Sequence, residues 1–211
     1  MPFEDELNQI LPADLPGRDQ VVSQAAQHLE LIVEANQHLN LTRITGAREA
    51  AIKHVLDSVI PWRLFSGAKH VMDAGTGPGF PGIPLALVLP GTRFTLAESI
   101  QKKARFVESV VTKLELRNVI VVPRRVEEIW REGGVDVITA RAFAPIPRAL
   151  GLLAPALKAG KRLLLYKGPD ADREIAEAEK EAGKLRAKMA VVMRYDLPDS
   201  LGSRTIVQID V

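Results

Sequence analysis

Short apolar runs alternate with longer amphipathic segments through the middle of the chain. The apolar runs predict strands at residues 70–74, 93–97, 118–122, 135–140 and 161–167. The other segments predict helices near residues 82–89, 101–115, 125–131 and 145–158, followed by a polar helix at 170–188. Strands and helices that alternate in this way are typical of an α/β protein with a doubly wound parallel sheet.

The C-terminal segment departs from this alternation. Two further apolar runs, 190–197 and 204–211, are separated only by residues 198–203, without a helical pattern between them. Strands joined by so short a connection form a hairpin and run antiparallel. We therefore predict a mainly parallel, seven-stranded sheet with an antiparallel edge at its C-terminal end.

The N-terminal part of the chain has a helical pattern instead. One helix face is predicted to carry Val22, Ala25, Ala26, Leu29, Ile32 and Val33. Asn40-Leu41-Thr42 interrupts this pattern, and a further helix is predicted from Ala47 to Leu64, with Pro61 near its end. We predict a helical extension, residues 1–66, that packs on a core domain of residues 67–211.

The junction between the first strand and the next helix carries the strongest chemical signal. The strand ends at Asp73, and the chain turns through Gly75, Gly77 and Gly79 before a helical segment begins. Glycines let the backbone turn sharply and approach a ligand, and a helix N-terminus offers unpaired N–H groups. Phe80 stands where the dinucleotide-binding pattern requires Gly or Ala, so a pyrophosphate is disfavoured. The loop also contains Pro78, Pro81 and Pro84, whose rigidity favours a preformed pocket for a compact ligand.

Two charged residues follow neighbouring strands of the predicted sheet. Glu98 comes directly after the second strand, where a carboxylate can accept hydrogen bonds from both hydroxyls of a ribose. The alternative is an acid that caps the following helix. Arg141 follows the fourth strand at the same sheet edge, and it either faces an entering substrate or forms a salt bridge with a neighbour.

Composition excludes several kinds of site. The chain has 211 residues, a formal net charge of +2 and no cysteine, which excludes disulfides, thiolate metal sites and a thiol nucleophile. The four histidines have no metal-binding spacing, so no metal is predicted. No apolar stretch is long enough to span a membrane, and the acidic start is unlike a secretory leader, so we expect a cytoplasmic protein.

Charge is distributed unevenly along the sequence. Residues 1–60 contain four Lys or Arg against nine Asp or Glu, whereas residues 100–131 contain eight against four. The basic stretch lies near the glycine-rich junction and favours a polyanionic partner. Solvated helix faces are the alternative interpretation.

Several motifs together resemble the bacterial RsmG family, also called glucose-inhibited division protein B. They are Asp73-Ala-Gly-Thr-Gly-Pro-Gly-Phe-Pro-Gly-Ile-Pro-Leu85, Asn40-Leu-Thr42, Lys53-His-Val-Leu-Asp-Ser58, Ala140-Arg-Ala-Phe143 and Lys167-Gly168. The resemblance implies a Rossmann-like class I methyltransferase that uses S-adenosylmethionine (SAM). Its implied product is N7-methylguanine in the 530 loop of 16S rRNA, at position 527 of the usual rRNA numbering.

The resemblance also implies site residues. The implied cofactor contacts are Gly75, Phe80, Val126, Glu127 and Arg141, to which the glycine-loop argument adds Gly77 and the ribose argument adds Glu98. Basic residues predicted to bind RNA are Arg43, Lys53, Arg124, Arg125, Arg148 and Lys167. Arg141 and Lys167 are candidates for positioning the substrate. The expected partner is 16S rRNA or the small ribosomal subunit, bound by a monomer.

No catalytic base is predicted, because guanine N7 has a free lone pair and no proton to lose. His54 and Asp57 either reach the rim of the site or form a hydrogen-bonded pair between helices, and Phe143 either stacks on a base or packs in the core.

Three other functions compete with this interpretation. An NAD-dependent oxidoreductase is disfavoured by Phe80 and by the lack of a Tyr-x-x-x-Lys pair. Methylation of another RNA base is disfavoured because carbon-5 methylation needs a cysteine and amino-group methylation typically needs an Asn/Asp-Pro-Pro-aromatic string. An RNA-binding protein without enzymatic activity would not require an intact glycine loop.

Overall fold

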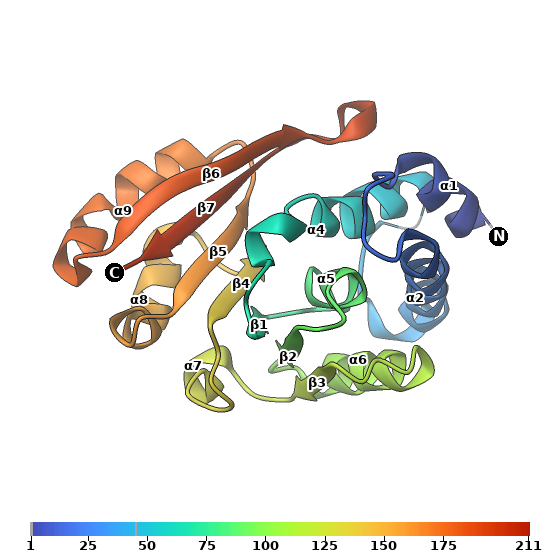
Figure 1. Ribbon diagram of the computed structural model, residues 1–211, viewed down its shortest axis with the longest axis horizontal. Coiled ribbons are helices and arrows are strands. Elements are labelled where there is room, and N and C mark those ends of the chain that lie inside the picture. Colours follow the sequence, from blue (N-terminus) through green and yellow to red (C-terminus); the bar gives the residue numbers. More distant parts are fainter. Residues whose placement is uncertain (1, 45) are drawn as a thin grey trace.

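The computed structural model describes residues 2–44 and 46–211, and within these residues one mixed sheet forms the centre of the molecule (Figure 1). Its strands are β1 (His70–Ala74), β2 (Arg93–Ala97), β3 (Val119–Val122), β4 (Val137–Arg141), β5 (Arg162–Lys167), β6 (Lys188–Asp196) and β7 (Ser203–Asp210). Their order is β3-β2-β1-β4-β5-β7-β6, and the pairs among β1 to β5 are parallel.

The C-terminal hairpin completes this sheet in an order that the sequence did not specify. β7 pairs antiparallel with both β5 and β6, so it lies between them and β6 is the edge strand. The predicted fold, a mainly parallel sheet with an antiparallel C-terminal element, is confirmed. The strand that runs antiparallel to its neighbours, β7, is the last but one in the sheet, and β6 forms the edge.

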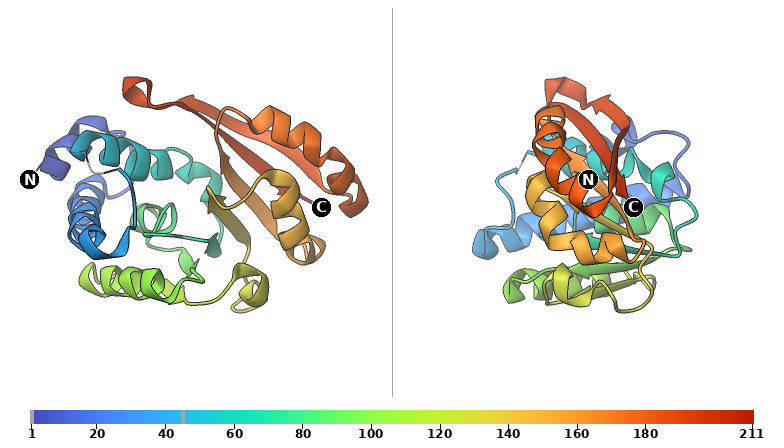
Figure 2. Two further views of the ribbon diagram at one scale, coloured as in Figure 1. Left: turned by 180° about the vertical axis from the view of Figure 1, so that it is seen from behind. Right: turned by 90° about the vertical axis from the view of Figure 1, so that its left-hand side faces the viewer.

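Helices cover both faces of the sheet (Figures 1 and 2). On one face lie α1 (Pro2–Ile10), α2 (Arg18–Leu39), α3 (Ala47–Ala50), η1 (Ala51–Leu56), α4 (Asp57–Val59), η2 (Trp62–Phe65), α5 (Gly82–Val88) and α6 (Gln101–Lys113). On the other lie α7 (Val126–Ile129), α8 (Ile146–Lys158) and α9 (Ala171–Leu185). The short η3 (Pro198–Ser200) joins β6 to β7.

Each face has its own hydrophobic cluster. The N-terminal helices share one cluster with α5, α6 and the sheet, and α7 to α9 form the other. The predicted α2 face is buried at Val22, Ala25, Ala26, Leu29 and Ile32, whereas Val33 is 40% exposed. By its spacing Val33 lies only about 20° from Val22 around the helix, so it shares this face, but it is not covered there. The division at residues 66 and 67 into an extension and a core domain stays a prediction.

The helix predicted from Ala47 to Leu64 is less regular than its pattern suggests. α3 continues through the π-helical turn η1 into α4, and the one-residue insertion typical of π-helices often occurs at functional sites. Pro61 lies just beyond α4, and the chain continues as the 3₁₀ turn η2. η1 carries Lys53 and His54, and Asp57 begins α4.

The tip of the C-terminal hairpin contacts the N-terminal helices (Figure 1). Arg48 on α3 lies 2.9 Å from a carboxylate oxygen of Glu6 on α1 and 2.5 Å from one of Asp199 in η3. Both acids raise the pKa of the Arg48 guanidinium. These contacts hold β6 and β7 across α4. Among the residues described, none of the helices combines the length and apolar character needed to cross a bilayer.

Candidate active site

The glycine loop between β1 and α5 is held tightly against β2. The N–H groups of Gly75 and Thr76 donate to the Ala97 carbonyl at 2.9 and 3.1 Å. Gly75 has φ +69°, a left-handed conformation that side chains disfavour. A Cβ on Gly82 would lie 2.2 Å from Leu96 Cδ2, so the start of α5 packs on the sheet without room for a side chain. The loop is therefore preformed by packing on both sides.

Asp73 anchors this loop from below. Its Oδ2 accepts hydrogen bonds from Thr76 Oγ1 at 2.6 Å and from the Gly82 N–H at 2.9 Å. The side chain is fully buried, and burial raises its pKa to about 6. Its other oxygen, Oδ1, is buried and has no hydrogen-bond partner among the residues that the structure describes. Near pH 7 an incompletely satisfied carboxylate therefore lies beneath the loop.

Glu98 anchors the loop from the end of β2. One carboxylate oxygen accepts from the Gly77 N–H at 3.0 Å, and the other accepts from the Ile100 N–H at the start of α6 at 2.8 Å. The contact with Ile100 corresponds to the predicted alternative, in which Glu98 caps the following helix. Each oxygen keeps a second lone pair, so the ribose-binding role stays a prediction.

Phe80 is enclosed by other side chains. Its ring is 4% exposed and stacks between His28 and His54, each with a centroid distance of 4.7 Å. The Arg141 guanidinium lies 5.4 Å from the same ring. Any cofactor contact of Phe80 therefore involves its backbone.

The two histidines beside Phe80 are neutral at ordinary pH. Burial lowers the pKa of His28 to about 4 and that of His54 to about 3. His28 Nε2 lies 2.8 Å from the Pro78 carbonyl, and His54 Nε2 lies 3.0 Å from Thr42 Oγ1. His54 and Asp57 thus have separate partners and do not form the pair that was one sequence-based alternative.

A cavity of about 160 Å³ opens beside the glycine loop. It is lined by Gly75, Ala97, Ser99, Arg124, Arg125, Val126, Glu127, Phe143, Ala144, Arg148 and Leu152. Three predicted cofactor residues, Gly75, Val126 and Glu127, are thus brought together. Phe143 forms part of the wall, 3.1 Å from the position of a Cβ on Gly75.

A second cavity, of about 400 Å³, lies on the other side of the segment that follows β4. It is lined by Ile44, Lys53, His54, Asp57, Arg141, Ala142, Tyr166, Lys167, Gly168, Glu174 and Arg204. Ala142 faces this cavity, whereas Phe143 and Ala144 face the first. Ala142 has φ +53°, the kind of strained backbone that accumulates at functional sites.

The salt bridge considered for Arg141 is found in the structure, and the substrate-facing role stays a prediction. Its Nη1 donates to the Lys53 carbonyl at 2.8 Å and to Asp57 Oδ2 at 3.0 Å, and the side chain also lines the second cavity. Lys167 lies 2.6 Å from Glu174 Oε2 and donates to the Ala144 carbonyl.

The other predicted RNA-binding residues are more dispersed. Lys53 pairs with Glu49 at 2.7 Å, and Arg124 pairs with Glu132. Arg125 and Arg148 are exposed at the first cavity, and Arg43 is exposed outside both linings.

Comparison with known proteins identifies the chain's relatives. A family model described as rRNA small subunit methyltransferase G matches residues 21–199. The chain belongs to this family. It is 66% identical to the Ribosomal RNA small subunit methyltransferase G of Solibacter usitatus, over 99% of this chain and 100% of that protein. Identity to the same-named protein of Carboxydothermus hydrogenoformans is 38%, over 86% of this chain and 79% of that protein.

Solved structures show the same fold at low identity. The O-methyltransferase TomG from Streptomyces achromogenes, in complex with SAM, has a TM-score of 0.58 and 16% identity over 88% of this chain and 89% of that chain. The mitomycin 7-O-methyltransferase MmcR has a TM-score of 0.61 and 15% identity over 92% of this chain and 67% of that chain. The predicted RsmG family, rRNA methyltransferase class and class I fold are confirmed, and SAM is the cofactor of this class.

The residues at the site fit that cofactor. The loop brings the backbone of Gly75 to the first cavity, Glu98 offers lone pairs for hydroxyls, and the Asp73 carboxylate favours a cation nearby. The N–H groups of the loop already donate to Thr76, Ala97, Glu98 and Asp73, so they are not the unpaired donors that the sequence predicted. Sequence reasoning missed the structural role of His28 and the partners of Asp57, because these contacts join segments without a shared motif.

Replacement of Glu98 by glutamine tests its place in the cofactor site. The amide cannot accept hydrogen bonds through both head atoms, so either Gly77 or Ile100 loses its acceptor, and the predicted contact with the ribose loses an acceptor too. We expect SAM affinity to fall about tenfold or more in isothermal titration. Glu108→Gln, an equal change on α6, serves as the control and leaves the affinity unchanged.

Proposed function

We propose that this enzyme transfers the methyl group of SAM to N7 of a guanine in the 530 loop of 16S rRNA, position 527 in the usual rRNA numbering. The observation that carries the proposal is the pair of cavities on opposite sides of residues 142–144, in a chain of the rRNA small subunit methyltransferase G family. One cavity adjoins the glycine loop, and basic side chains outnumber acidic ones in the linings of both.

The cofactor residues are assigned as follows in this proposal. Backbone of Gly75, Gly77 and Phe80 holds the methionine part, Glu98 binds the ribose, and Val126 with Glu127 borders the base. When bound, SAM supplies an electrophilic methyl group on a sulfonium. Asp73 favours that cationic ligand through its charge, although its buried oxygen is not in direct reach of the cavity. Arg141 is proposed to contact the cofactor or the acceptor nucleotide.

The acceptor needs positioning more than proton transfer. Guanine N7 is a hydrogen-bond acceptor with a free lone pair, so no base has to remove a proton. This agrees with the neutral, enclosed state of His28 and His54. Orientation of two reactants can lower a barrier by roughly 7–11 kcal/mol. Arg141 and Lys167 are the proposed positioning residues.

The remaining proposals concern the partner. Arg43, Lys53, Arg124, Arg125, Arg148 and Lys167 are proposed to contact the RNA backbone. We further propose that the enzyme acts as a cytoplasmic monomer on 16S rRNA or on the small ribosomal subunit.

Transfer of labelled methyl groups tests this function. Small subunits from a strain that lacks the enzyme are incubated with the protein and methyl-labelled SAM. We expect about one label per 16S rRNA, and isothermal titration should show binding of SAM but not of NAD. Binding of NAD alone would favour the oxidoreductase, and binding of neither cofactor would favour an RNA-binding protein without enzymatic activity.

A further inference from the structure

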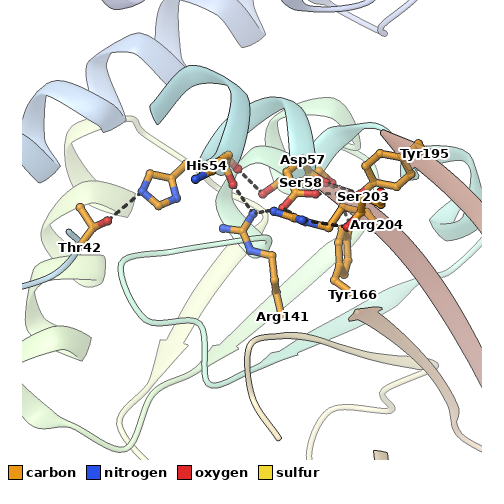
Figure 3. A network of polar contacts seen from close by, with 10 residues as sticks. Thr42, His54, Asp57, Ser58, Arg141, Tyr166, Tyr195, Ser203 and Arg204 are labelled. Atoms are coloured by element: carbon orange, nitrogen blue, oxygen red, sulfur yellow. Dashed lines mark hydrogen bonds and ion pairs between the residues drawn. The ribbon is translucent and has the colours of Figure 1, made fainter. Parts of the chain in front are cut away.

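Asp57 is the centre of a polar network that joins α4 to β4 and to both strands of the C-terminal hairpin (Figure 3). Its side chain is 2% exposed. It accepts hydrogen bonds from Arg141 Nη1 at 3.0 Å, from Arg204 Nε at 3.2 Å and from the Tyr195 hydroxyl at 3.0 Å. One buried carboxylate therefore orients two guanidinium groups, one at the end of β4 and one on β7.

Each of these arginines retains unused donors. Arg141 Nη1 is shared with the Lys53 carbonyl, and Arg204 Nη1 donates to the Ser203 carbonyl. Within the described part of the chain, Nη2 of neither arginine makes a hydrogen bond. The two side chains are 16% and 20% exposed, and both line the 400 Å³ cavity. The unused N–H groups are therefore available to a ligand there.

The lining of this cavity has an excess of positive charge. Its cationic side chains are Lys53, Arg141, Lys167 and Arg204, and its anionic side chains are Asp57 and Glu174. Four cations against two anions leave an excess of two positive charges. His54 adds none, because burial lowers its pKa to about 3. A recess with fixed guanidinium donors and this charge suits a phosphate group, which arginine can bind through two N–H groups.

We propose that this cavity binds a phosphodiester of the RNA strand beside the acceptor guanosine, with Arg204 as a phosphate ligand and Asp57 as the positioning residue that orients Arg204 and Arg141. The proposal rests on the proposed function, since it makes the occupant a segment of the RNA substrate. The strained Ala142 separates this cavity from the one beside the glycine loop. A nucleotide held here therefore adjoins the methyl donor.

Arg204→Gln tests the phosphate contact through the salt dependence of RNA binding. The probe is a single-stranded RNA that spans the 530 loop, bound to the cofactor-free protein at several salt concentrations. Loss of one phosphate contact should reduce the slope of log K against log salt by about 0.7 and weaken binding about tenfold. The affinity for SAM should not change.

Arg194→Gln is the matched control. Arg194 lies on the same hairpin, in register with Thr205, but pairs with Asp172 on α9 and does not line the cavity. The Arg194→Gln substitution removes the same charge as Arg204→Gln, but it should leave the salt slope and the affinity for RNA unchanged. An Arg204→Gln slope equal to that of wild type would overturn the proposal, and so would loss of SAM affinity with RNA affinity retained.

Two further variants separate positioning from folding. Arg204→Lys keeps the charge beside Asp57 but lacks the planar fork, so RNA affinity should fall severalfold while the slope stays as in wild type. Asp57→Asn keeps both arginines but no longer fixes their orientation. RNA affinity should again fall severalfold while the slope of log K against log salt stays as in wild type. Equal losses of RNA and SAM binding in both variants would indicate a merely structural network and contradict the proposal. Since these assays measure binding alone, they remain interpretable if the methylated base proves to be a different one.

Discussion

Replacement of Phe80 by alanine should lower the free energy of unfolding by about 3–5 kcal/mol and abolish measurable binding of SAM. The ring is almost completely buried, and its removal leaves a cavity between His28 and His54. His28 then loses its stacking partner although it holds the Pro78 carbonyl of the glycine loop. The loop therefore loses the lateral support that keeps its backbone in place. Urea denaturation and isothermal titration measure the two effects.

Phe106→Ala separates the two consequences. Phe106 belongs to the same hydrophobic cluster but lies on α6, and it does not stack on His28 or His54 as Phe80 does. The same truncation should also destabilise the protein by a few kcal/mol, yet leave SAM affinity within about twofold of wild type. If Phe80→Ala retained wild-type SAM affinity, the supporting role assigned to the ring would be wrong.

Replacement of Asp73 by asparagine should stabilise the fold and weaken cofactor binding. An amide oxygen in the place of Oδ2 can accept from both Thr76 and Gly82, and the amide nitrogen then occupies the position of the unpartnered Oδ1. The variant thus keeps the loop but removes a buried charge. With the pKa raised from 3.8 to about 6, ionisation costs on the order of 3 kcal/mol above pH 6.

The difference in the free energy of unfolding between Asp73→Asn and wild type should depend on pH, in a sense that follows from the direction of the pKa shift. Between about pH 4 and pH 6 the folded protein holds a proton on Asp73 that the unfolded chain has released. The contribution of Asp73 to stability is therefore retained below pH 4 and lost as the pH rises to 6. Asp73→Asn should match wild type in the free energy of unfolding near pH 4 and exceed it above pH 6.

SAM affinity should change in the opposite sense. Wild-type affinity should fall as the pH drops below 6 and Asp73 becomes neutral, by at most tenfold per pH unit. Asp73→Asn should bind SAM at least about tenfold more weakly at pH 7.5 and lack this pH dependence. A variant that is both less stable and unaffected in SAM binding would contradict the role of the buried charge.

The architecture was largely predictable because hydrophobic runs define strands whatever their partners. The predicted strand at residues 161–167 is observed as Arg162–Lys167, and the one at 135–140 as Val137–Arg141. Strand order within the hairpin was not predictable, since apolar runs do not state which strand pairs with β5. The glycine loop was recognisable because its residues are contiguous.

The second cavity was only partly predictable, because its lining residues come from segments that are distant in sequence. Lys53, Arg141 and Lys167 come from family motifs, and the structure brings them together. Arg204 follows the stretch matched by the family model and meets Asp57 across 147 positions of sequence. Such a contact depends on the hairpin reaching across α4, which no local pattern encodes. Sequence likewise could not choose between a salt bridge and a substrate-facing position for Arg141; the structure shows the salt bridge with Asp57 and places the side chain in the cavity lining.

The methylated atom is the most direct test of the central claim, that the two cavities bring SAM and guanine N7 of the 530 loop together. Unmethylated small subunits are treated with the enzyme and SAM, and the 16S rRNA is then reduced with borohydride and cleaved with aniline, a chemistry that breaks RNA at N7-methylguanine. We predict one new, SAM-dependent cleavage, at position 527. Methylation at another base, or at another atom of that guanine so that no cleavage occurs, would contradict the claim.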